Sequence, residues 1–173
     1  MDCGGSAALK AALQIKLQDH LHKRNLLLQS TRAIRSMYRQ PEYWPLIQLI
    51  LSIPGIGEIN AAIILFELQD IFRFKSFDNL CSYVGLIPDT DDSGETKRSK
   101  GLTHRRNNFL REALIESSWV LVKKDPAMLM KYKAYCQRMH KNKAIIKIAR
   151  HLLARINYVL RKQMPYQNGV VSG

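Results

Sequence analysis

The chain has 173 residues, 46% of them hydrophobic, and a formal net charge of +13 from 27 Lys and Arg against 14 Asp and Glu. This length suits one main domain with a helical appendage better than two full domains. No run approaches the ~18 uncharged apolar residues of a membrane-spanning helix, and the first residues lack a signal-peptide pattern, so we expect a soluble cytoplasmic protein without membrane contact.

The first predicted element is a long amphipathic helix over residues 7–39. It contains no Gly or Pro, and its leucines recur at spacings of four and seven. These leucines are Leu9, Leu13, Leu17, Leu21 and Leu28. Residues 7–40 therefore predict a coiled-coil-like arm that docks or dimerises, which favours a homo-oligomer. Residues 1–6 are expected to be disordered or foreign to the natural protein.

The next stretch, residues 45–68, predicts two apolar helices that meet in a tight turn. Pro54 cannot continue a helix, Gly55 and Gly57 tolerate positive φ, and Ile56 between them is expected to pack inward. The second helix would begin near Gly57, with its free N–H groups and positive dipole end facing an anion such as a phosphate. This pattern is typical of a helix-hairpin-helix. The alternative interpretation is a tight corner between two core helices.

Four further helices follow in the sequence. Ser76 can cap a helix through Tyr83 that Gly85 closes, and Asn107 or Asn108 can cap the next. The helical stretches after residue 100 cover Phe109–Lys123, Pro126–Cys136 and Ala144–Met164. No segment alternates as a strand does, so we predict an all-α fold with a main domain at residues 41–165 and a disordered tail at 166–173.

The positive charge is concentrated in the second half of the chain. From Ser117 to the end there are twelve Lys and Arg and one acidic residue, Asp125. Such an imbalance indicates a polyanionic partner, although a solvated basic helical face would look the same. Together with the hairpin, it favours nucleic acid.

Residues 88–100 contain no apolar side chain and predict a long exposed loop. Its carboxylates do not fit an EF-hand, because Lys100 stands where a bidentate Glu is required. A single divalent ion held by Asp89, Asp91 and Asp92 is an alternative, but isolated carboxylates in a loop are more often solvated. The three cysteines and five histidines show no metal-binding spacing, so we predict no metal site in this chain.

The same loop carries the ingredients of a nucleophile that attacks a phosphodiester. Ser93 stands beside the flexible Gly94, and fixed cations near it could stabilise the charge of the transition state. These cations are Lys97, Arg98, Lys100, Arg105, Arg106 and Arg111. The only local candidates for a general base are His104 and the nearby Asp residues.

Several motifs occur in an order that resembles the C-terminal transposase domain of the insertion-sequence 110/116/902 family, over about residues 46–160. The motifs are Pro54–Gly57, Phe74–Leu80, Tyr83–Leu86, Ser93-Gly94, Gly101 and Leu110-Arg111.

The resemblance implies a DNA transposase or recombinase in which Ser93 attacks DNA and forms a phosphoserine intermediate. It also implies DNA contacts by the basic segment after Ser93 and by Arg111, a noncoding bridge RNA as partner, and action at the nucleoid. A divalent metal, Mg²⁺, would belong to an N-terminal RNase-H-like domain that this chain lacks. We therefore expect this chain alone to bind DNA, through Gly55 and Gly57 as well, but not to recombine it. The alternative is a noncatalytic helix-hairpin-helix module that binds nucleic acid.

Overall fold

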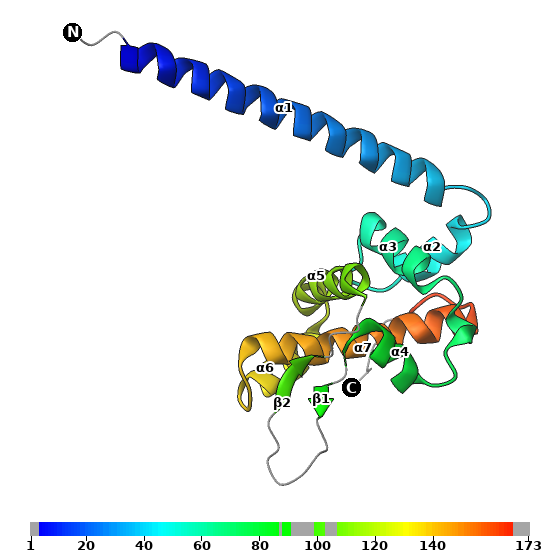
Figure 1. The fold of residues 1–173 in the computed structure, drawn as a ribbon. Coiled ribbons are helices and arrows are strands. Elements are labelled where there is room, and N and C mark those ends of the chain that lie inside the picture. The colour runs from blue at the N-terminus through cyan, green and yellow to red at the C-terminus, as the bar shows by residue number, and fades with distance from the viewer. Residues whose placement is uncertain (1–3, 87, 91–98, 103–106, 168–173) are drawn as a thin grey trace. The chain divides into compact units, whose positions relative to one another are not determined.

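The computed structural model describes residues 4–86, 88–90, 99–102 and 107–167 (Figure 1). The chain divides into two compact units, Met1–Gln40 and Pro41–Gly173. In order, the elements are α1 (Gly4–Tyr38), α2 (Trp44–Leu51), α3 (Glu58–Leu68), the 3₁₀ helix η1 (Ile71–Arg73), α4 (Phe77–Val84), β1 (Pro88–Thr90), β2 (Ser99–Leu102), α5 (Asn108–Lys124), α6 (Pro126–Cys136) and α7 (Lys141–Lys162). The predicted all-α class is confirmed.

The first unit contains one helix, α1, whose 35 residues correspond to a length of about 52 Å. It begins at Gly4, so the expectation of disorder up to residue 6 is wrong from Gly4 onward. The leucines predicted to form its apolar stripe are exposed to between 46% and 62%. The stripe therefore has no apolar partner within its own unit.

The second unit is built around α7. This helix packs against α2, α4, α5, α6 and η1, and α3 packs against α5. In Figure 1, α2, α3 and α5 lie above α7, and β1 and β2 lie below it. The apolar residues of α7 that point into the unit recur at helical spacing and are fully buried, as expected for one side of an amphipathic helix. It includes Ile148, Leu152, Ile156 and Val159.

Three helices of this unit begin with a side-chain cap at a residue that the sequence indicates. Ser76 Oγ accepts from Asn79 N at 3.1 Å before α4, and Gly85 closes that helix in the left-handed conformation at φ 76°. Asp125 Oδ1 accepts from Met128 N at 3.1 Å and begins α6. The cap of α5 is Asn107 rather than Asn108.

Two results differ from the sequence-based expectation. Strands β1 and β2 pair in antiparallel fashion, Pro88 with Leu102 and Thr90 with Ser99, at the two ends of the segment predicted as a loop. Such a short ladder uses backbone groups alone, so it leaves no alternating apolar pattern in the sequence.

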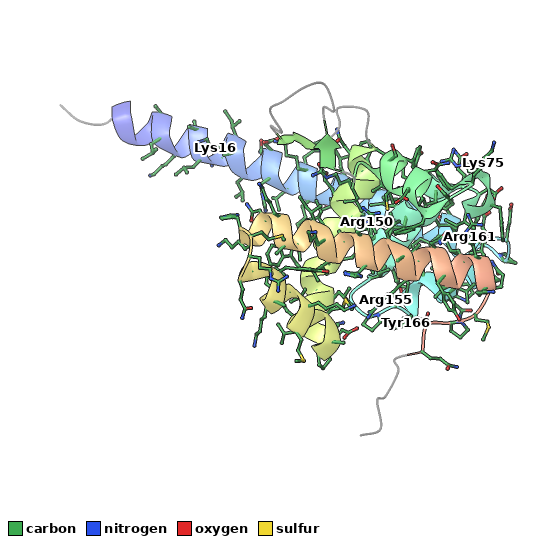
Figure 2. The ribbon with its side chains drawn as sticks, turned by 90° about the horizontal axis from the view of Figure 1, so that it is seen from below. Lys16, Lys75, Arg150, Arg155, Arg161 and Tyr166 are labelled. Atoms are coloured by element: carbon green, nitrogen blue, oxygen red, sulfur yellow. The ribbon has the colours of Figure 1, made fainter. Side chains whose placement is uncertain are left out.

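The second difference concerns the segment after α7. Tyr166 belongs to the tail predicted as disordered, but its backbone N–H donates to Ser52 Oγ at 2.7 Å. The guanidinium carbon of Arg155 lies 4.5 Å from the Tyr166 ring centroid, and Figure 2 shows the two side chains beside each other. A hydrogen bond and a cation–π contact thus fix this residue.

Candidate nucleic-acid interface

The turn between α2 and α3 has the geometry that its Pro-Gly sequence predicts. Gly55 has φ +96°, which L side chains rarely adopt, and Ile53 and Ile56 on either side of it are buried. Gly57 is the N-cap of α3 in an extended conformation, and no side chain caps this helix. Gly57 has no side chain, so it provides no acceptor for the N–H groups of the first turn of α3.

The two glycines of the turn have different surroundings. A Cβ atom on Gly55 would lie 2.6 Å from Leu121 N and 2.8 Å from the Ser117 carbonyl oxygen, both in the backbone of α5. At Gly57 a Cβ atom would meet nothing within 4 Å. Gly55 is therefore required for the packing of the turn on α5, whereas Gly57 faces open space and is accessible to a ligand.

An open hollow of about 500 Å³ lies at this turn, between the start of α3 and the second half of α5. Its lining residues are Gly55, Ile56, Gly57, Asn60, Glu116, Trp119, Val120 and Lys124. Asn60 joins the two walls, because its Nδ2 donates to Ser117 Oγ at 3.1 Å. The hollow thus combines a helix N-terminus with an exposed aromatic side chain.

Lys124 supplies the cation that the hairpin itself does not contain. It lies in the last turn of α5 and reaches the hollow because Gly55 lets the turn approach the α5 backbone closely. Glu116 on the same helix contributes an opposing charge. Lys124 could not be predicted as part of this site from the sequence, because its place depends on the packing of α3 on α5.

The predicted nucleophile and most of its cations lie outside the described residues. These are Ser93, Lys97, Arg98, Arg105 and Arg106, and also Asp91 and Asp92 of the single-ion alternative. Lys100 stands in β2. Arg111 lies in the first turn of α5 and lines a separate hollow of about 230 Å³ with Asn108, Glu112 and Ile115. The structure therefore brings Gly55 and Gly57 together but does not place Arg111 in their hollow.

A polar network holds the chain where it leaves and re-enters the β1–β2 segment. The hydroxyl of Tyr83 donates to the Glu67 carbonyl oxygen at 3.1 Å, and the backbone N–H of Asn107 donates to the Tyr83 carbonyl oxygen at 3.3 Å. Asn107 also donates from Nδ2 to Glu67 Oε2 while its Oδ1 accepts from Leu110 N. Sequence reasoning missed Glu67, which lies 40 positions from Asn107.

Arg73 joins the same network through contacts with two aromatic rings and with Glu67. Its guanidinium carbon lies 4.6 Å from the ring centroids of both Phe74 and Tyr83, and its Nη2 donates to the Glu67 carbonyl oxygen at 3.5 Å. The ends of the segment that carries Ser93 are thus fixed by α3, α4 and α5 together.

Within the described ranges there is no group of three or more His, Cys, Asp or Glu side chains that could hold a metal ion. The described helices also include none that is long and apolar enough to cross a membrane.

The comparisons with known proteins agree with the order of motifs along the chain. A family model described as Transposase IS116/IS110/IS902 family matches residues 47–133, which include the hairpin, the β1–β2 segment and α5. The chain belongs to this transposase family.

Two curated proteins of insertion elements are similar to most of this chain. A 43.6 kDa protein of insertion element IS110 from Streptomyces coelicolor is 28% identical over 133 residues, 76% of this chain and 33% of that protein. The transposase for insertion sequence element IS1111A from Coxiella burnetii is 29% identical over 126 residues, 70% of this chain and 35% of that protein. The chain thus spans about a third of the length of these relatives.

Proposed function

We propose that this member of the IS116/IS110/IS902 transposase family binds DNA through the α2–α3 hairpin and supplies Ser93 as the nucleophile that attacks a DNA phosphodiester. The observation that supports it best is the hollow at Gly57, which the start of α3 and Lys124 line together. Amide groups at a helix N-terminus bind phosphate without reading the base sequence. This contact would set the position of DNA on the protein.

The proposed reaction is a transesterification. The Ser93 hydroxyl gives its proton to a base, its Oγ forms a bond to phosphorus, and the bond from phosphorus to one deoxyribose oxygen breaks. That oxygen takes up a proton and leaves, so that a phosphoserine linkage joins protein and DNA. The cations near Ser93 in the sequence, from Lys97 to Arg111, would stabilise the charge that develops on the phosphoryl oxygens.

Other parts of the full reaction are proposed to belong to the longer protein. A divalent metal, Mg²⁺, would be held by acidic residues of an N-terminal RNase-H-like domain, and a noncoding bridge RNA would pair with the DNA. These proposals rest on the family alone. In the full-length protein, chelation by EDTA is expected to abolish recombination, and DNA binding by the present chain should be unaffected.

The arm is proposed to join two copies of the chain through α1. Its five leucines are exposed to between 46% and 62%, and burial stabilises a contact by about 1.5–3 kcal/mol for each fully covered leucine. Sedimentation velocity of the chain with Leu13→Lys and Leu17→Lys should show a monomer where the unmodified chain shows a dimer. A matched variant with Lys10→Gln and Lys16→Gln should stay dimeric. A monomeric unmodified chain at micromolar concentration would exclude pairing.

The DNA contact is tested at Gly57. Asp is a better N-cap than Gly, so Gly57→Asp should preserve the fold, while its carboxylate occupies the hollow and repels phosphate. Fluorescence anisotropy with a duplex should show at least a tenfold loss of affinity for Gly57→Asp and little change for Gly57→Ser, whose cap is neutral. Equal affinities for the two variants would contradict the hairpin contact.

The catalytic role is tested in the full-length protein with Ser93→Ala. This variant should form no covalent protein–DNA adduct on a denaturing gel, whereas the unmodified protein should. A persisting adduct would exclude Ser93. The noncatalytic helix-hairpin-helix alternative predicts no adduct with either protein, and DNA binding that still depends on Gly57.

A further inference from the structure

The most one-sided charge in the chain lies on α6 and α7. Between Pro126 and Lys162 there are ten Lys and Arg and no Asp or Glu. The two helices pack against each other, so parts of their charged surfaces are adjacent. The hairpin contact at Gly57 uses none of these residues.

The arginines of α7 hold this helix to the rest of the unit. Arg150 pairs with Asp78 of α4, and Arg155 pairs with Asp125 at the start of α6, each at 2.7 Å. Arg161 donates to the backbone carbonyl oxygens of Ile71 and Phe74. Figure 2 shows the three arginines spread along α7. Their charges are thus already used in structural contacts.

The lysines of the same region are arranged differently. Lys131, Lys143 and Lys147 are exposed, and none of them forms an ion pair with a carboxylate of the described residues. Lys143 and Lys147 lie one turn apart on one face of α7. The Lys147 ammonium group is 5.6 Å from the Tyr135 ring centroid, which connects this face to α6.

His151 and Tyr135 join the two helices at the centre of this face. Tyr135 Oη and His151 Nε2 are 3.0 Å apart, and the rings stack at 13°. Burial lowers the pKa of His151, and the charges of Lys131, Arg155, Lys147 and Arg150 lower it further. All four charged neighbours are cationic, and two of them, Lys131 and Lys147, form no ion pair within the described residues.

We propose that this cationic α6–α7 face, defined by Lys131, Tyr135, Lys143, Lys147 and His151, binds the phosphate backbone of nucleic acid. The proposal rests on the proposed function and adds a second contact surface to the hairpin. Ammonium groups bind phosphate as point charges without the fork that reads a base edge, so the contact would not depend on sequence. Side-chain amides or carboxylates that could discriminate bases are absent from the five residues that define the face.

The test replaces Lys143 and Lys147 by Gln and measures affinity by fluorescence anisotropy between 50 and 300 mM salt. Each lost phosphate contact lowers the slope of log K against log salt by about 0.9 for duplex DNA, so the double variant should lose about two units of slope. Lys75→Gln with Lys133→Gln makes the same change in net charge away from the face and should keep the slope. The measurement is made with a duplex DNA and with a hairpin RNA of equal length. The nucleic acid whose slope changes is the one whose backbone this face binds.

The outcomes separate this proposal from the hairpin contact. Unchanged slopes with both nucleic acids, or equal losses in the two lysine pairs, would overturn the α6–α7 contact even if Gly57→Asp weakens binding. A lower slope only in the Lys143 and Lys147 variant would support it even if Gly57→Asp has no effect. Absence of any binding by the unmodified chain would overturn both. Circular dichroism of each variant verifies that α6 and α7 remain folded.

Discussion

Asp125 Oδ2 lies 2.7 Å from Arg155 Nη1, with only 8% and 13% of the two side chains exposed. Burial alone would raise the pKa of Asp125, but the contact with Arg155 and the backbone N–H groups of Met128 and Ala127 outweigh it and leave this pKa below 3.8. One carboxylate therefore both begins α6 and neutralises the arginine of α7.

Removal of this carboxylate should be strongly destabilising. Asp125→Ala leaves the largely buried Arg155 without a carboxylate partner, and we expect a loss of about 3–5 kcal/mol in the free energy of unfolding. Urea denaturation provides the measurement. Asp78→Ala breaks the exposed ion pair with Arg150 and is expected to cost about 0–1 kcal/mol. Similar losses for the two variants would contradict the role assigned to burial.

Asp125 should make the folded state less stable as the pH falls. Because its pKa is lower in the folded state than its ordinary value of 3.8, the unfolded state binds the proton more readily. This contribution is present above about pH 4 and is lost as the pH falls through the folded pKa. Asp125→Asn should therefore remove part of the acid sensitivity, measured as the midpoint of acid unfolding.

Gly55→Ala should disturb the turn more than any change at Gly57. The added Cβ atom would meet the Leu121 and Ser117 backbone and would occupy a left-handed conformation, with an expected cost of about 2–4 kcal/mol. Gly57→Ser should stay within about 0.5 kcal/mol of the unmodified chain, because Ser is a good N-cap. The melting temperatures of the two variants provide the comparison, and equal values would contradict the close packing of Gly55.

Asn107→Ser should separate helix capping from the positioning of the Ser93 segment. Ser retains a cap for Leu110 N, so the stability should change by less than about 1 kcal/mol, but it is too short to reach Glu67. In the full-length protein we expect the rate of DNA adduct formation to fall about 10- to 100-fold, because displacement of a reacting group by about 1 Å has effects of this size.

The matched control for this prediction is Ser76→Ala, which removes the cap of α4 at a similar cost in stability but leaves the Glu67–Asn107 contact intact. Its adduct rate should remain normal. An Asn107→Ser variant as fast as the unmodified protein would show that the network serves the fold only.

His151 should titrate below its ordinary pKa of 6.5. Because its folded pKa is lowered, the protein loses stability as the pH falls below about 6.5, down to the folded pKa. Lys147→Gln removes one of the cations and should raise the pKa, measured from the imidazole proton shifts by NMR, whereas Lys75→Gln should not. Bound duplex DNA should raise it too. A pKa that is the same with and without DNA would place the phosphates elsewhere.

Local features of the fold could be predicted from the sequence because they depend on residues close together. The caps at Ser76 and Asp125 require a donor only three positions away, and the Pro54–Gly57 turn follows from backbone preferences. The apolar periods of α5 and α7 likewise identify their buried faces.

The geometry of the candidate site depends on pairs that are distant in the sequence. Lys124 reaches the hollow only because α3 packs on α5 at Gly55, and Glu67 meets Asn107 only because α3, α4 and α5 converge. Neither pair has a spacing that a single sequence could reveal. Serine and arginine residues suited to a catalytic site can be recognised in a sequence. The residues that hold them in position are brought together only by tertiary packing.

The hydrogen bond from Tyr166 to Ser52 spans 114 residues, and this has a consequence for synthesis on the ribosome. At 5–20 residues per second, roughly 6 to 23 s pass between translation of Ser52 and of Tyr166. During this interval the apolar α2–α3 hairpin exists without α7, against which α2 packs. The hairpin can pack on α7 only after that helix has been translated, so the second unit completes its fold only near the end of its translation.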